Sequence, residues 1–186
     1  LIISCISSAI AEIIFPAVFS DGMVLQREKP IQLCGTVKPN AKVSIRFGGI
    51  IKNTIAESDG AFVITLKSQS ASKKPRTIYI KSGNDQIQIK NVVVGEVWLC
   101  SGQSNMEWKV NQSANYEVEK KSANYPLIRM ITVKHKFHTE PQFNFEGNWR
   151  STTPESVGSF SAVGYYFGRE LFTELNVPIG LISSSW

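Results

Sequence analysis

A run of small polar residues after an apolar strand is the segment of this sequence best suited to chemistry. Ser-Gly-Gln-Ser-Asn, residues 101–105, follows the apolar Val97–Cys100 and precedes a short amphipathic stretch. A serine at such a junction lies at the carboxyl end of a strand, beside the N–H groups that begin a helix. Those N–H groups can stabilise an oxyanion, and Gly102 would let a substrate approach the backbone. We therefore interpret Ser104 as a candidate nucleophile, with a turn and helix cap as the alternative.

The side chains next to Ser104 have two possible roles. Gln103 and Asn105 could contact a substrate, or they could stabilise the turn by hydrogen bonds. Glu107 falls in the first helical turn, where the helix dipole favours an acidic side chain, so we interpret it as structural. The segment is not Gly-x-Ser-x-Gly, so the nucleophile elbow of the α/β-hydrolases is not matched.

Aromatic, thiol and imidazole side chains lie near this segment or further along the chain. Trp98 and Trp108 could stack on a sugar face, but core packing is the favoured interpretation. Cys100 reads as a buried thiol, because no basic residue adjoins it in the strand. His135 and His138 lie in a polar stretch and indicate solvated loop histidines, with substrate contact or a catalytic base as alternatives.

Alternation of polar and apolar residues predicts strands over much of the first half of the chain. The expected strands are 31–37, 42–47, 51–57, 61–67, 77–81 and 86–94. Turn-forming residues separate them, and Asp59-Gly60 between two apolar runs predicts a hairpin. Short strands at this spacing, without a helical period, indicate a β-sandwich-like module.

The spacing of the apolar residues along the sequence changes after residue 94. Strands are expected at 127–133 and 179–184, with a helix over 161–175 between them. Ser159 or Ser161 could cap that helix. One helical face is expected to carry Val163, Phe167, Leu171 and Leu175. Strand, helix and strand in this order predict an α/β domain with a parallel sheet.

The chain of 186 residues therefore divides into three expected parts. Residues 1–11 resemble the apolar region of a clipped signal peptide ending in Ala-x-Ala, with a buried first strand as the alternative. Residues 12–91 form the β module and 92–186 the first part of the α/β domain, with the boundary near 91–95. A signal peptide predicts the secretory pathway, with an extracellular or lysosomal destination. Eleven apolar residues are too few for stable membrane insertion.

Composition excludes several other classes of protein. The sequence is 42% apolar and carries a net charge of +5, with basic residues scattered rather than gathered in a stripe, so we expect no nucleic-acid partner. Three cysteines are too few for a disulfide scaffold, and no metal-ligand spacing is present, so no metal is expected. Asn111 begins an Asn-x-Ser sequon and is a glycosylation candidate.

Several segments in order along the chain resemble the sialate O-acetylesterase family, whose members are related to the SGNH hydrolases. The similar segments are Phe15–Arg27, Gly95–Met106, Phe160–Leu171 and Val177–Trp186. The resemblance implies a three-layer α/β/α domain and places the nucleophile in Gly-Gln-Ser-Asn-Met, which is Ser104 here. It further implies that the Ser104 N–H is an oxyanion donor and that no cofactor is needed. The implied substrate is an O-acetylated sialoglycan.

The same resemblance implies residues that this sequence does not contain. The family takes its base from a late Asp-x-x-His motif, which has no match here, so these 186 residues are expected to be inactive alone. The chain begins with Leu1 and ends on the apolar strand-like run before Trp186, so we expect an amino-terminal piece that is truncated at both ends. Two alternatives remain open: an acetylxylan or other polysaccharide acetylesterase, and a non-catalytic carbohydrate-binding β module. The oligomeric state is left open.

Overall fold

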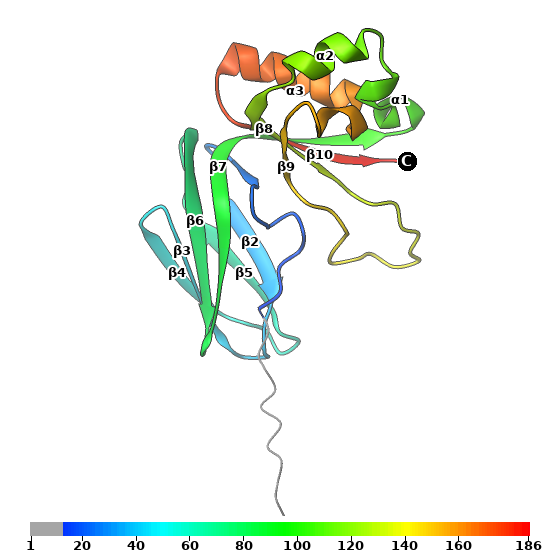
Figure 1. Ribbon diagram of the computed structural model, residues 1–186. Coiled ribbons are helices and arrows are strands. Elements are labelled where there is room, and N and C mark those ends of the chain that lie inside the picture. The colour runs from blue at the N-terminus through cyan, green and yellow to red at the C-terminus, as the bar shows by residue number, and fades with distance from the viewer. Residues whose placement is uncertain (1–12) are drawn as a thin grey trace, which may run out of the picture.

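A computed structural model describes residues 13–186 (Figure 1). The predicted signal segment, residues 1–11, lies outside the described residues, so the secretory localisation stays a prediction. Over residues 13–186, no helix combines the length and the apolar character needed to cross a membrane.

Two facing β-sheets make up the first part of the chain. A two-stranded sheet, β2–β5, lies opposite strands β3, β6 and β7 (Asp85–Gly102), and their apolar side chains share one core. The strand pattern predicts such a sandwich-like arrangement for this part. Its strands are β1 (Val24–Gln26), β2 (Ile31–Thr36), β3 (Lys42–Phe47), β4 (Ile50–Ile55), β5 (Ala61–Leu66) and β6 (Ser72–Ser82).

Alternation decides which side chains enter this core. In β3, Val43, Ile45 and Phe47 are fully buried, whereas Lys42 and Arg46 are exposed. Successive strand residues point to opposite faces, so the apolar set faces the second sheet.

The predicted hairpin at Asp59-Gly60 is wrong. β4 pairs with β3 and β5 pairs with β2, so this turn carries the chain from one sheet to the other. Gly60 has φ of +89°, and a Cβ there would lie 2.3 Å from the Val37 carbonyl oxygen. The Asp-Gly pair therefore makes a tight turn, but the strands on either side do not form a ladder.

One long strand, β7 (Asp85–Gly102), runs through the predicted domain boundary. Its first half pairs with β6, residues Val93–Gly95 pair with β1, and its second half pairs with β10 (Ile179–Ser185). The strand bends between the two parts (Figure 1), where Asn91 adopts φ of 56° and the ladder to β6 shifts register. The boundary near residues 91–95 therefore falls inside a strand rather than in a linker.

The second part contains the predicted parallel sheet. β10 lies between β7 and β8 and is parallel to both, whereas β9 pairs antiparallel with β8. Among the described residues the helices lie on one face of this sheet (Figure 1), so a second helical layer stays a prediction. The remaining elements are α1 (Ser104–Glu107), η1 (Val110–Gln112), α2 (Tyr116–Ser122), β8 (Tyr125–Thr132), β9 (Arg150–Thr152), η2 (Val157–Ser159) and α3 (Ala162–Leu175).

Helix α3 lies at the predicted place, but most of its predicted apolar face is exposed. Val163, Phe167 and Leu175 are 41–48% exposed, and the buried side is formed by Ala162, Gly164, Tyr165 and Gly168. Small residues let the helix approach the sheet closely, since a Cβ at Gly168 would lie 2.6 Å from a methyl of Leu181. Of the expected apolar face only Leu171 packs against the second core, so counting large apolar residues did not identify the buried side.

Candidate functional site

Ser104 is the first residue of α1, and only Gln103 separates it from Gly102, the last residue of β7. Gly102 pairs with Ser185 of β10, and the Trp186 N–H donates to the Gly102 carbonyl at 2.9 Å. This pairing fixes the end of the strand from which the serine projects. The predicted strand–turn–helix junction is confirmed.

Two backbone N–H groups are free at the start of α1. Met106 N–H and Glu107 N–H both donate to the Gln103 carbonyl, and Trp108 N–H donates to the Ser104 carbonyl. Within residues 13–186, the N–H groups of Ser104 and Asn105 donate no hydrogen bond. They are the unsatisfied donors that a helix start presents, and they can stabilise a negatively charged oxygen.

Shallow grooves of about 400 Å³ lie on both sides of this turn. One is lined by Gln103, Ser104, Asn105, Met106 and Val163. The other is lined by residues 101–103, 133–136 and 184–186. The structure therefore brings the predicted Gly102, Gln103, Ser104 and Asn105 to one exposed place. The Ser104 hydroxyl makes no hydrogen bond to another described residue, so it is open to a ligand.

His135 is exposed in a loop, as the sequence interpretation predicts, but it also makes contacts that the sequence does not indicate. Its Nε2 lies 2.8 Å from the Ser185 carbonyl oxygen and 3.5 Å from a carboxylate oxygen of Glu107, and its ring packs on Trp186 at 4.9 Å between centroids. Because both nearby groups are acceptors, Nε2 carries a proton and donates it. That nitrogen cannot also accept a proton from Ser104 in this arrangement. His138 is exposed, as expected for a loop histidine.

The two tryptophans that flank the turn are not core residues. Trp98 and Trp108 are 43% and 53% exposed, so the core-packing interpretation is wrong. Trp98 packs edge-on against Phe167 of α3, with 5.0 Å between the ring centroids, outside the buried side of that helix.

Cys100 is buried as predicted, and burial raises the pKa of its thiol. Among residues 13–186, neither Cys34 nor Cys100 forms a disulfide.

The buried hydroxyl of Ser161 holds α1 against the start of α3. It accepts from Gly164 N–H at 3.2 Å, which confirms the predicted cap, and it donates to the Met106 carbonyl. Backbone hydrogen bonds from Ala162 to Trp108 and from Val110 to Phe160 run beside it. The sequence indicates the cap but contains no sign of the contact with Met106, which is 55 residues away.

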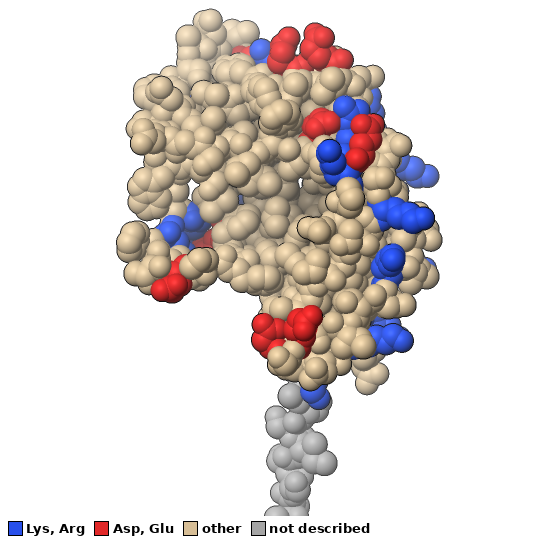
Figure 2. Space-filling view, turned by 180° about the vertical axis from the view of Figure 1, so that it is seen from behind, with Lys and Arg blue, Asp and Glu red and all other residues tan. Residues whose placement is uncertain are grey.

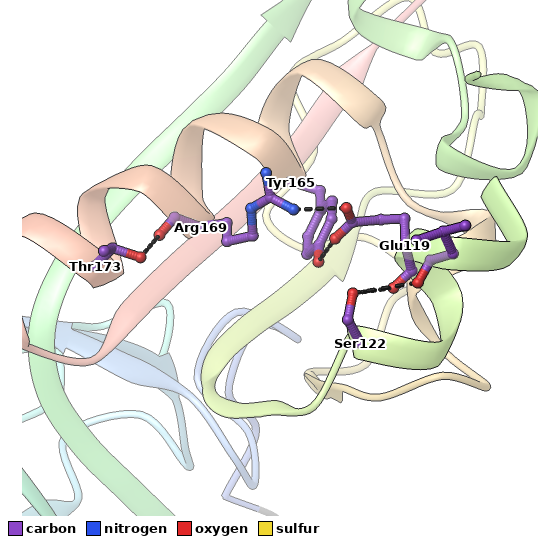
Figure 3. Close-up of polar contacts among 6 residues, drawn as sticks. Glu119, Ser122, Tyr165, Arg169 and Thr173 are labelled. Carbon is purple, nitrogen blue, oxygen red and sulfur yellow. Dashed lines mark hydrogen bonds and ion pairs between the residues drawn. The ribbon is translucent and has the colours of Figure 1, made fainter. Parts of the chain in front are cut away.

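A second polar cluster joins α2 to α3 (Figure 3). Glu119 accepts hydrogen bonds from the Tyr165 hydroxyl and, at 2.6 Å, from Arg169. Burial and the nearby Glu119 raise the pKa of Tyr165, so this phenol stays protonated and donates.

The segment before α2 carries Asn111, which is exposed on η1 as a glycosylation site requires.

Metal ligation has no geometric support in the part of the chain described. No three His, Cys, Asp or Glu side chains of residues 13–186 are grouped as a metal site would need. The chemistry that the described site can offer is that of one exposed hydroxyl and the free N–H groups beside it.

Comparison with solved structures identifies the general class. The chain superposes on a carbohydrate acetylesterase from Xanthomonas citri with a TM-score of 0.90 and 33% identity, over 94% of this chain and 40% of that one. The fold of the described residues is therefore that of part of a carbohydrate acetylesterase. No family model matches the chain.

Curated relatives identify the family. The human sialate O-acetylesterase is 32% identical to this chain over 92% of this chain's length. The rat sialate O-acetylesterase is 36% identical over 58% of this chain's length. The chain belongs to the sialate O-acetylesterase family. It spans about a third of the length of the human relative, 36%.

Proposed function

We propose that the whole protein containing this chain hydrolyses O-acetyl esters on carbohydrates, with Ser104 as the nucleophile. The observation that supports this most directly is an exposed serine hydroxyl beside two free N–H groups, at a strand–helix junction, in a chain of this family. The three-layer SGNH-type domain belongs to the same proposal.

The proposed reaction has two steps and needs no cofactor. Ser104 Oγ attacks the acetyl carbonyl carbon and loses its proton to a histidine base. The carbonyl oxygen becomes an oxyanion beside the Ser104 N–H, and the sugar oxygen leaves with the proton that the base returns. Water then attacks the acetyl-serine by the same route, which releases acetate and regenerates the hydroxyl.

The base in this proposal comes from residues beyond those described. His135 Nε2 is hydrogen-bonded to the Ser185 carbonyl, so it is not positioned to take the proton. We therefore keep the prediction that residues 1–186 alone have no esterase activity, and we assign the activity to the whole protein.

O-acetylated sialic acid is the proposed substrate, because the curated relatives are named sialate O-acetylesterases. An acetyl ester on another carbohydrate is the second candidate. The Xanthomonas citri neighbour favours it, since that enzyme is a carbohydrate acetylesterase.

Acetate release by the full-length protein tests the role of Ser104. We expect Ser104→Ala to lower kcat/KM by at least about 10³-fold with an unchanged melting temperature, as loss of a serine nucleophile does. Ser68→Ala, at an exposed serine of the β-sandwich, is the control and should match the wild type. Comparison of O-acetylated sialic acid with acetylxylan separates the two substrate classes. A folded wild type that deacetylates neither would favour the carbohydrate-binding module over an enzyme.

A further inference from the structure

Strands β3 and β6 of the β-sandwich lie far from α1 (Figure 1), and their outer face carries a group of positive charges. Because Val43, Ile45 and Phe47 of β3 face the core, the alternate residues Lys42 and Arg46 face outward. Figure 2 shows Lys and Arg side chains gathered along the side of the sandwich where β3 and β6 lie.

Ser44 is the centre of this group. It lies between Lys42 and Arg46 on β3, directly across from Lys81 on β6 and from Asn53 on β4. Residues two apart on a strand are about 7 Å from each other, and directly paired residues are about 5 Å apart on the same face. Three cations therefore surround one small hydroxyl. We call Lys42, Ser44, Arg46, Asn53 and Lys81 the basic face.

Acidic side chains do not neutralise the basic face. Among residues 13–186, its three cations form no salt bridge. Asp85, at the end of β7, pairs with the buried Ser82 and so belongs to the opposite face of the sheet. Like charges on neighbouring strands repel, and an anion seated over Ser44 would relieve that repulsion.

Apolar and aromatic groups border the cations. Arg46 lies over the ring of Tyr79 at 4.4 Å, which holds its guanidinium against the sheet. Ile51 lies across from Arg46 and Ile55 across from Lys42, and these side chains are 61% and 66% exposed. A flat face with cations at its centre and exposed apolar groups at its edge fits a sugar ring that carries a negative charge.

We propose that the basic face binds an acidic glycan, with a sugar carboxylate over Ser44 and the ring against Ile51 and Ile55. The same face is a poor fit for single-stranded nucleic acid, because the ring of Tyr79 is covered by Arg46 and offers no stacking surface. This is a second site, which goes beyond the esterase reaction. It would hold an acidic glycan chain while Ser104 acts elsewhere on it.

Binding of the full-length protein to immobilised polysialic acid tests the proposal. We expect the triple variant Lys42→Gln/Arg46→Gln/Lys81→Gln to bind roughly tenfold or more weakly, and wild-type binding to weaken as salt is raised. The matched control, Lys29→Gln/Lys67→Gln/Lys121→Gln, removes the same charge from exposed lysines elsewhere and should bind like the wild type. Ser44→Glu should also abolish binding, whereas Thr65→Glu, on the exposed side of β5, should not.

The proposal would be overturned if the folded wild type did not bind polysialic acid, or if both triple variants lost the same amount of binding. It would also be overturned if the wild type bound duplex DNA or phosphatidylserine vesicles more tightly than polysialic acid at the same salt. Melting temperatures confirm that each variant is folded. Ser104→Ala should bind polysialic acid like the wild type, so failure of the esterase proposal and failure of this one are told apart.

Discussion

At the scale of single residues, Ser104 is accessible because of the backbone that precedes it. Gly102 has φ of +148°, a conformation that residues with a side chain rarely adopt, and Gln103 is extended at the cap position. Together they turn the chain from strand to helix within two residues. A Cβ at position 102 would meet only the Met106 Cβ, at an ordinary 3.4 Å, so conformation rather than space requires glycine there.

Gly102→Ala is therefore expected to strain the turn that carries the nucleophile. The cost should be about 1–3 kcal/mol of stability, together with a loss of kcat, because Ser104 shifts. Thermal denaturation and acetate release by the full-length protein measure both. Gly83→Ala is the control, since its φ of +59° lies in the left-handed region and open space surrounds it. Equal activity in the two variants would contradict a special role for Gly102.

The position of Ser104 could be predicted because the pattern that fixes it is local. An apolar strand, a glycine and a short helical stretch follow one another within ten residues. The surroundings of His135 could not be predicted in this way, because its partner Ser185 lies 50 residues further along the chain. Only the parallel pairing of β10 with β7 and β8 brings those residues together.

At the scale of elements, Ser161 couples α3 to the short helix α1. A helix of four residues cannot be stable alone, so its geometry depends on the elements that it contacts. The Ser161 hydroxyl satisfies the Met106 carbonyl, one of the groups that a helix end leaves without a partner.

Ser161→Ala should therefore act on catalysis as well as on stability. The change leaves the Met106 carbonyl and the Gly164 N–H short of a partner, at a cost of about 1–2 kcal/mol. Because Ser161 is buried and touches no substrate, we expect kcat to fall roughly tenfold with KM unchanged. Thr152→Val, which removes another buried hydroxyl bonded to the Ile128 carbonyl, is the matched control. Equal loss of kcat in both variants would reduce Ser161 to a purely structural role.

The sequence predicted where the helices and strands begin and end better than it predicted which of them contact each other. Strict alternation marked the strands of the sandwich, and Asn176, in the left-handed conformation, ends α3 where the pattern predicts. Most of the large apolar residues of α3 lie outside its buried side, because Gly164 and Gly168 allow close packing that no count of such residues reveals. The hairpin at Asp59 was wrong because local turn chemistry does not say which strands pair.

At the scale of the whole molecule, polar contacts hold the two parts together around β7. Arg129 of β8 is buried and donates to the Gly22 carbonyl at 2.7 Å and to the Asn91 side chain at 2.9 Å. Burial lowers the pKa of its guanidinium. Nearby, Glu96 of β7 accepts hydrogen bonds from Gln26 and Arg27, at the end of β1.

Acid should weaken the second of these contacts. The hydrogen bond from Gln26, together with Arg27, lowers the pKa of Glu96 below its ordinary value of 4.5. A carboxylate whose folded pKa is depressed stabilises the protein above its unfolded pKa, and this stabilisation disappears as the pH falls through the folded value. We therefore expect Glu96→Gln to lower the melting temperature at pH 7, with the difference from wild type shrinking below about pH 4.5.

Glu57→Gln, at an exposed carboxylate, is the control for this measurement and should not change the melting temperature at pH 7. A gap between wild type and Glu96→Gln that stays constant from pH 7 to pH 3 would show that packing, rather than charge, accounts for the effect.

The continuity of β7 also bears on how such a protein can change over evolution. A recombination break near residues 91–95 would divide a strand that β1 and β6 already share, since Val94 pairs with both Leu25 and Ser72. Each half would lose backbone partners, and the half that carries Ser104 would lose its supporting sheet. We therefore expect the two parts to be inherited together as one unit, and not to be exchanged with other proteins as separate domains.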